Sequence, residues 1–239
     1  MIKIKYFILS INLPCFVLAD LGTMKFRNMS TDGPALILVD IQKGFTNIEY
    51  WGGKRNNLDA EFRASELLKV WRDSGLPVFH VQHCSTNPNS PLHETNPGNQ
   101  FNDLVVPIDG EQIIKKNVNS AFIGTDLQAQ LDQAKITTLV IAGLTTDHCI
   151  STTTRMAGNL GYETFLVAAA TATFDKKGIN GQIFPAELIH QTALASLHKE
   201  FATVITTDVT RQTRVFNPAK KIRMISRAKQ NSLMINLGK

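Results

Sequence analysis

The 239-residue chain is long enough for one sizeable α/β domain and short for two. Its hydrophobic content of 43% is typical of a folded globular protein and excludes an intrinsically disordered one. The net charge of +5 lies in the termini, because residues 211–239 carry +8 and residues 1–30 carry +3, which leaves residues 31–210 with −6. An acidic body argues against nucleic-acid binding, which requires a basic face.

Residues 1–30 have two interpretations. Lysines precede an apolar run over residues 6–19 that ends in a small-residue site at Ala19, as in a secretory signal peptide, and the run is too short for a membrane span. Alternatively, translation begins at Met24 or Met29. The first interpretation predicts a periplasmic or secreted protein, and the second predicts a cytoplasmic one.

The other end of the chain and the cysteines give weaker information. Residues 211–239 are basic without clear periodicity, which favours a disordered or partner-dependent extension over a nucleic-acid or membrane segment. Three cysteines, Cys15, Cys84 and Cys149, make a poor disulfide framework. We therefore expect one folded domain over residues 31–210.

Within that domain, apolar runs alternate with segments of helical periodicity. The predicted strands cover residues 34–41, 76–82, 111–116, 136–142, 163–169 and 202–206, and the predicted helices cover residues 59–74, 124–134, 148–161 and 185–200. This alternation predicts an α/β fold with a parallel sheet and right-handed crossovers. Residues 84–100 are rich in Asn, Pro and Ser and are predicted to form a long functional loop.

Two candidate catalytic side chains follow predicted strands. Asp40 ends the first strand, at the edge where open α/β sheets bind ligands, although a lone Asp there is more often a cap or turn residue. Cys149 falls in the first turn of the helix after the fourth strand, where free backbone N–H groups and the helix dipole favour a thiolate. The alternative for Cys149 is a small buried apolar residue.

Histidines near the long loop raise the question of a metal. His80 and His83 lie three residues apart, so a strand points them to opposite faces, and His93 follows in the loop. No carboxylate or cysteine completes a tight cluster with them by spacing. The sequence therefore predicts neither a metal site nor a cofactor.

Three motifs then occur in order. They are LVDIQKGF over residues 38–45, Lys116 four residues before the Ser-Ala-Phe of residues 120–122, and AGLTTDHC over residues 142–149. Together they resemble the isochorismatase-like cysteine hydrolases, a family that includes nicotinamidases and N-carbamoyl amide hydrolases. The resemblance covers about residues 31–210. It implies a Rossmann-like three-layer α/β/α sandwich with a six-stranded parallel sheet, and a homo-oligomer whose subunit number the sequence leaves open.

The resemblance also implies a catalytic triad of Asp40, Lys116 and Cys149, and a cis peptide bond between Leu144 and Thr145. The match before Ser-Ala-Phe selects Lys116 over its neighbour. In this arrangement Lys116 and the helix start would both lower the pKa of the thiol, and Asp40 would exchange a proton with it. Backbone N–H groups of Thr145 and Cys149 would bind the oxyanion.

Departures from branches of the family narrow the activity. True isochorismatases cleave a vinyl ether without needing the cysteine, so Cys149 favours hydrolysis of a small non-peptide amide. Nicotinamidases carry an Asp-x-His metal cluster after the second strand, and no match to it occurs here, which disfavours nicotinamide. The open alternatives are an ether-cleaving isochorismatase and a non-catalytic interaction protein on the same fold.

The expected pocket is aromatic. By position, Phe45, Trp51, His148 and Phe174 are predicted to line it, which suggests a small, partly flat or cyclic amide as substrate. His148 has an equal alternative as a cap or a subunit-contact residue. No membrane or nucleic-acid partner is expected.

Overall fold

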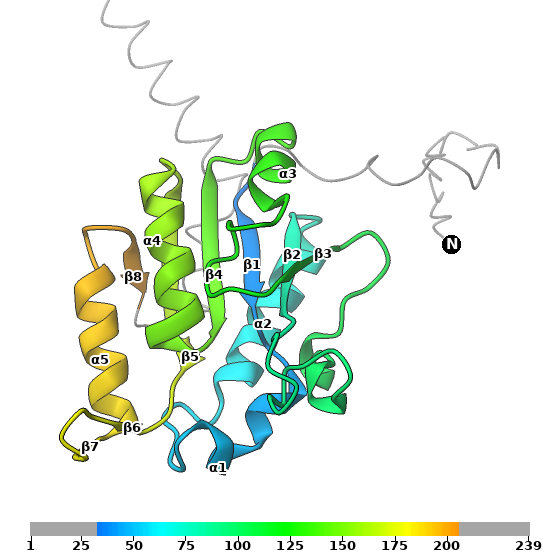
Figure 1. Cartoon of the computed structure of the whole chain (residues 1–239). Coiled ribbons are helices and arrows are strands. Elements are labelled where there is room, and N and C mark those ends of the chain that lie inside the picture. Colours follow the sequence, from blue (N-terminus) through cyan, green and yellow to red (C-terminus); the bar gives the residue numbers. More distant parts are fainter. Residues whose placement is uncertain (1–32, 206–239) are drawn as a thin grey trace, which may run out of the picture.

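A computed structural model describes residues 33–205 of the chain, and these residues form a six-stranded parallel sheet of order β3-β2-β1-β4-β5-β8 (Figure 1). The strands are β1 Ala35–Val39, β2 Val78–His83, β3 Gln112–Lys116, β4 Thr138–Leu144, β5 Glu163–Ala172 and β8 Thr203–Ile205. All five strand pairs are parallel, which confirms the predicted fold class. The N-terminal extension and the basic C-terminal tail of the sequence analysis lie outside the described residues.

Helices cover both faces of the sheet (Figure 1). Helix α2 (Ala60–Asp73) packs on one face, and α3 (Leu127–Gln133), α4 (Ser151–Asn159) and α5 (Ala186–Leu197) pack on the other. Strand β1 serves both layers because its side chains alternate: Leu36 and Leu38 join the cluster of Trp71, whereas Ile37 joins that of Leu131. Among residues 33–205, none of the helices combines the length and the apolar character that a membrane span requires.

Short elements connect this framework and were not predicted. They are η1 (Lys43–Thr46), α1 (Ile48–Trp51), η2 (Pro97–Asn99), η3 (Asp103–Val105) and an antiparallel pair of two-residue strands, β6 (Lys176–Lys177) and β7 (Ile183–Phe184). Strand β5 also continues three residues past its predicted end, with a register shift against β4. Such pairings depend on tertiary contacts and leave little trace in local periodicity.

One buried polar network fixes the β2–β3 edge. His80 is fully buried, and its Nε2 lies 2.8 Å from Glu111 Oε2, while Arg72 of α2 donates two hydrogen bonds to the same carboxylate. Burial raises the pKa of Glu111, but the hydrogen bonds from Arg72 and His80 outweigh it and lower the pKa to about 2. His80 therefore has a structural partner, on the face that carries α2.

The strand order reverses between β1 and β4, and the two strands approach closely at their carboxyl ends. Gly143 adopts φ +132°, and a Cβ on it would lie 1.9 Å from the carbonyl oxygen of Val39. Only glycine suits this position, because a side chain would collide with the β1 backbone and strain its own. The residues that follow both strands, Asp40 and Thr145, are thereby brought to one crevice, where open α/β sheets bind ligands.

Candidate active site

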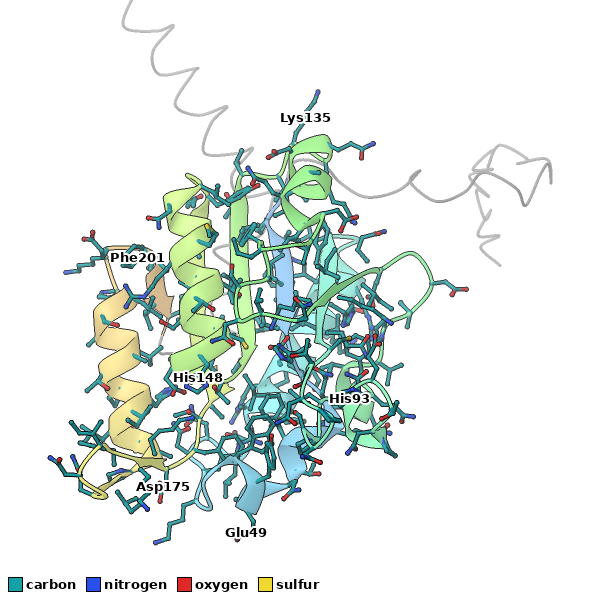
Figure 2. All side chains as sticks on the ribbon, in the orientation of Figure 1. Glu49, His93, Lys135, His148, Asp175 and Phe201 are labelled. Carbon is teal, nitrogen blue, oxygen red and sulfur yellow. The ribbon has the colours of Figure 1, made fainter. Side chains whose placement is uncertain are left out.

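Four side chains from four parallel strands or their following turns meet at the carboxyl edge of the sheet. Asp40 directly follows β1, His83 ends β2, Lys116 ends β3, and Cys149 lies in the π-helical turn η4 (Thr146–Ile150) after β4. In Figure 2, His148, the residue before Cys149, lies at this edge of the sheet. Lys135, which precedes β4, lies at the opposite end. Parallel strands bring these residues together because their carboxyl ends share one edge.

The centre of the site is a buried ion pair. Lys116 Nζ donates to Asp40 Oδ2 at 2.7 Å, and both side chains have 0% exposure. Asp40, directly after β1, has φ +54°, an uncommon conformation for a non-glycine residue. Its other oxygen, Oδ1, is buried without a hydrogen-bond partner among the described residues. That oxygen is available to accept a proton.

Cys149 lies beside this pair and is 8% exposed. Its Sγ is 3.8 Å from Asn119 Oδ1, to which the thiol donates. Burial and the Asp40 carboxylate raise the pKa of the Cys149 thiol, and the opposing effect of Lys116 is smaller. This shift is opposite in direction to the low-pKa thiolate that we predicted, because burial cannot be read from the sequence and the Asp40 carboxylate opposes Lys116.

The backbone around Cys149 matches the implied arrangement with one difference. The peptide bond between Leu144 and Thr145 is cis, at the position that the resemblance implied. The carbonyl oxygen of Thr145 accepts hydrogen bonds from the N–H groups of His148 and Ile150. The first turn after β4 is thus wider than an α-helical turn, and the regular helix begins at residue 151, not at residue 148.

The Ser-Ala-Phe segment of the second motif is attached to α4. The N–H of Ala121 donates to Thr153 Oγ1 at 3.0 Å, and both residues are buried. This bond holds the segment with Asn119 against the helix that follows Cys149. Sequence reasoning missed Asn119, because a single Asn in a loop has no distinguishing pattern.

His83 is the second residue that sequence reasoning missed. Its Nδ1 lies 2.9 Å from Lys116 Nζ and 4.0 Å from Asp40 Oδ2. One nitrogen of His83, one oxygen of Asp40 and Cys149 Sγ lie within 4.8 Å of one another. The expectation that no carboxylate or cysteine groups with this histidine is therefore wrong. The signal in the sequence is that His83 directly follows the predicted strand over residues 76–82, much as Asp40 ends the first predicted strand.

These three residues have the donor types of a metal site, but Lys116 argues against that use. The ammonium group lies at hydrogen-bond distance from both the Asp40 oxygen and the His83 nitrogen. A cation bound by the three side chains would have to displace that ammonium from the same donors. In this arrangement the set therefore suits a lysine and not a metal ion.

The predicted aromatic lining lies mostly in the core. Phe174 has no exposed surface and Phe45 is 3% exposed, and both belong to the cluster under α2. Trp51 is half-buried and stacks on Phe45, with ring centroids 4.6 Å apart, while its Nε1 donates to the carbonyl of Gly44. The first two rings thus support the loop after β1 and do not offer surface to a substrate.

His148 lies at the exposed end of η4. Its side chain is 56% exposed, and Nε2 is 3.4 Å from Asp147 Oδ2. The same carboxylate is 3.5 Å from Lys176 Nζ, and its other oxygen accepts a hydrogen bond from Thr173. Asp147 therefore links η4 to the segment after β5, and His148 is the one predicted lining residue with a largely exposed side chain.

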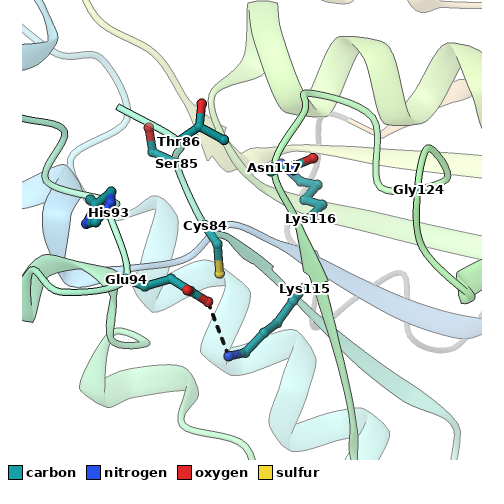
Figure 3. Close-up of a pocket in the computed structure, with 9 residues that line it drawn as sticks. All are labelled: Cys84, Ser85, Thr86, His93, Glu94, Lys115, Lys116, Asn117 and Gly124. Carbon is teal, nitrogen blue, oxygen red and sulfur yellow. Dashed lines mark ion pairs between the residues drawn. The ribbon is translucent and has the colours of Figure 1, made fainter. Parts of the chain in front are cut away.

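A cavity of about 520 Å³ opens beside the ends of β2 and β3 (Figure 3). It is lined by Cys84, Ser85, Thr86, His93, Glu94, Lys115, Lys116, Asn117 and Gly124. Figure 3 shows the ion pair of Lys115 with Glu94 beside Cys84. Lys115 Nζ and Glu94 Oε1 are 3.5 Å apart. Of the four grouped side chains, only Lys116 belongs to this lining.

The fold and these residues agree with comparisons to known proteins. The isochorismatase domain model matches residues 34–209, and the chain belongs to the isochorismatase family. It is 49% identical over 174 residues to the uncharacterised family protein YrdC of Bacillus subtilis, an alignment that covers 73% of this chain and 92% of that protein.

Two further relatives bear on structure and chemistry. A crystal structure of an isochorismatase-family protein from Chromobacterium violaceum superposes with a TM-score of 0.70 at 40% identity, covering 75% of this chain and 92% of the other. The maleamate amidohydrolase of Pseudomonas putida is 28% identical over 148 residues, which are 56% of this chain and 70% of that enzyme. The chain is thus an isochorismatase-family hydrolase with amidases among its relatives.

The buried ion pair predicts a large stability effect. Lys116→Met should lower the free energy of unfolding by about 3–5 kcal/mol, because it leaves the Asp40 carboxylate buried without its cation. Urea unfolding at pH 7 measures this change. The control is Lys69→Met, which breaks an exposed pair with Asp73 (side chains 74% and 62% exposed) and should cost under about 0.5 kcal/mol. Equal effects of the two substitutions would contradict the account.

The raised pKa of the thiol predicts slow alkylation. At pH 7, Cys149 should react with iodoacetamide more slowly than free cysteine does, because the thiol stays protonated. Asp40→Asn should speed the reaction several-fold, since removing the carboxylate charge lowers the pKa and raises the thiolate fraction. Peptide mass spectrometry separates Cys149 from Cys84. Faster alkylation of the wild type than of Asp40→Asn would contradict this assignment.

Proposed function

We propose that the protein is a cysteine amidohydrolase, which cleaves the C–N bond of a small non-peptide amide through an acyl-thioester on Cys149. One observation carries the proposal. A buried thiol, a carboxylate with an unpartnered oxygen and a lysine that holds that carboxylate meet at one crevice of the sheet. An apolar core cysteine has no need of a buried charged pair beside it.

In the first half of the reaction, Cys149 Sγ attacks the carbonyl carbon while its proton passes to Asp40. Lys116 keeps its own proton and its hydrogen bond to Asp40, so the positive charge stabilises the sulfur as it becomes a nucleophile. The N–H groups of Thr145 and Cys149 are the proposed donors to the tetrahedral oxyanion. Loss of one such donor typically costs about 100-fold or more in rate.

In the second half, the intermediate expels the amine, which takes the proton from Asp40. A water molecule then gives a proton to Asp40 and attacks the thioester, which releases the acid and restores the thiol. The sum is amide plus water giving acid plus amine. The raised pKa of the resting thiol fits this scheme, since Asp40 removes the proton only when the thiol attacks.

The cysteine distinguishes an amidase from the ether-cleaving alternative. Hydrolysis of a vinyl ether needs a proton donor, which Asp40 supplies without help from a thiol. Cleavage at an acyl carbon, in contrast, gives the thiol a role as the nucleophile that forms an acyl-thioester. The maleamate amidohydrolase among the relatives supports the amide assignment, and its substrate is one candidate.

The proposal predicts a strict dependence on the thiol. Purified protein should release amine or ammonia from at least one member of a panel of small amides that includes maleamate and carbamoyl compounds. Cys149→Ala should lower this turnover by at least about 1000-fold, because Cys149 supplies the thiol that lies beside Asp40. Ammonia release and product mass spectrometry measure it.

The matched control is Cys84→Ser, which removes the other described thiol and should leave turnover within about twofold. A panel without turnover by the wild type would contradict the proposal. So would turnover that survives Cys149→Ala, and cleavage of a vinyl ether by that variant would favour the isochorismatase reaction instead.

A further inference from the structure

The imidazole of His83 has a position and a protonation state that the mechanism above does not use. Its backbone is fixed by two buried amide side chains. Gln42 accepts from the N–H of His83 at 2.9 Å and donates to its carbonyl at 3.0 Å, and Asn99 donates to the same carbonyl at 2.9 Å. Gln42 is 1% exposed and Asn99 is 8% exposed. Such a frame holds the ring where a binding role would need it.

The contact with Lys116 determines which ring nitrogen carries the proton. A lysine ammonium has three donors and no acceptor, so His83 Nδ1, at 2.9 Å, accepts from it. A neutral imidazole with an unprotonated Nδ1 carries its hydrogen on Nε2. Burial and the positive charge of Lys116 lower the pKa of His83, against a smaller opposing effect of Asp40, and this favours the neutral ring.

The Nε2–H group is left available for a ligand. Among residues 33–205 it has no hydrogen-bond partner, and the Nε2 atom is not fully buried. The His83 side chain is 16% exposed, and one of its nitrogens lies within 4.8 Å of Cys149 Sγ. A molecule whose carbon is bonded to that sulfur therefore has its next atoms within reach of the ring.

We propose that His83 Nε2–H binds a second oxygen acceptor of the substrate, close to the carbonyl that Cys149 attacks. This inference rests on the proposed amidohydrolase. It names the substrate class as amides with two neighbouring carbonyl groups, of which oxamide is the simplest. A site built around a hydrogen bond discriminates against an analogue that lacks the acceptor, because the donor is then left unpaired.

The test compares two alkylating agents at Cys149. Iodoacetamide places an amide carbonyl next to the carbon that the sulfur attacks, and iodoethane has no acceptor. The ratio of the two rates cancels the thiolate fraction, so it reports only the interaction with the carbonyl. We expect His83→Ala to lower this ratio by about tenfold relative to the wild type, and His83→Gln to restore most of it, since an amide can both accept from Lys116 and donate.

His93→Ala is the matched control, because it removes a histidine of the neighbouring cavity and should leave the ratio unchanged. A ratio that is equal in the wild type, His83→Ala and His83→Gln would overturn the proposal. Far-ultraviolet circular dichroism checks that each variant is folded. If His83→Ala does not fold, the prediction is tested with His83→Gln, whose ratio must match that of the wild type and exceed that of Lys116→Met. In Lys116→Met the ring has lost the partner that fixes its hydrogen on Nε2.

The same measurement separates this inference from the proposed function, because alkylation requires no turnover. An unchanged ratio in a protein with Cys149-dependent amide hydrolysis refutes only the role of His83. A reduced ratio in a protein without that hydrolysis refutes the amidohydrolase and leaves the donor assignment intact.

Discussion

The ion pair between Lys116 and Asp40 is the interaction on which the rest of the site depends. Two opposite charges with no exposure to solvent are stable only when each satisfies the other, so they fix the ends of β1 and β3 relative to one another. Because β2 lies between these strands, the ion pair also lies beside His83, whose Nδ1 is 2.9 Å from Lys116 Nζ. The carboxylate is held by one oxygen, and its other oxygen is buried without a hydrogen-bond partner among the described residues. In the proposed reaction this second oxygen takes the proton of Cys149.

The sheet supplies the second constraint. β1 and β4 are neighbours across the point where strand order reverses, and Gly143 lets their backbones approach without a side chain between them. The carboxylate after β1 and the turn after β4 therefore lie side by side. The wide turn then places Cys149 next to Asp40, and the burial that results raises the pKa of the thiol instead of lowering it. In the proposed mechanism the thiol is therefore activated by Asp40, one oxygen of which lies within 4.8 Å of the sulfur, and not by a low pKa of its own.

The sequence predicted the six strands because each is a short apolar run bounded by polar residues, and Asp40 and Cys149 because both follow such runs. It could not predict the protonation of the thiol, which depends on burial and on two charges from distant strands. It also placed Phe45 and Phe174 in a pocket, since an aromatic residue near a motif carries no sign of which way it faces. His83 was missed because its partners are distant in the chain. Lys116 lies 33 residues after it and Asp40 lies 43 residues before it, and only the strand register brings them together.

Direct detection of the acyl-thioester is the measurement closest to the central claim. During turnover of an active amide in the presence of hydroxylamine, the wild type should form the hydroxamate of the acyl group, and an acid-quenched sample should carry that acyl mass on the peptide with Cys149. If the amide is consumed while no hydroxamate forms and this peptide keeps its unmodified mass, the thiol is not the nucleophile and the account is wrong.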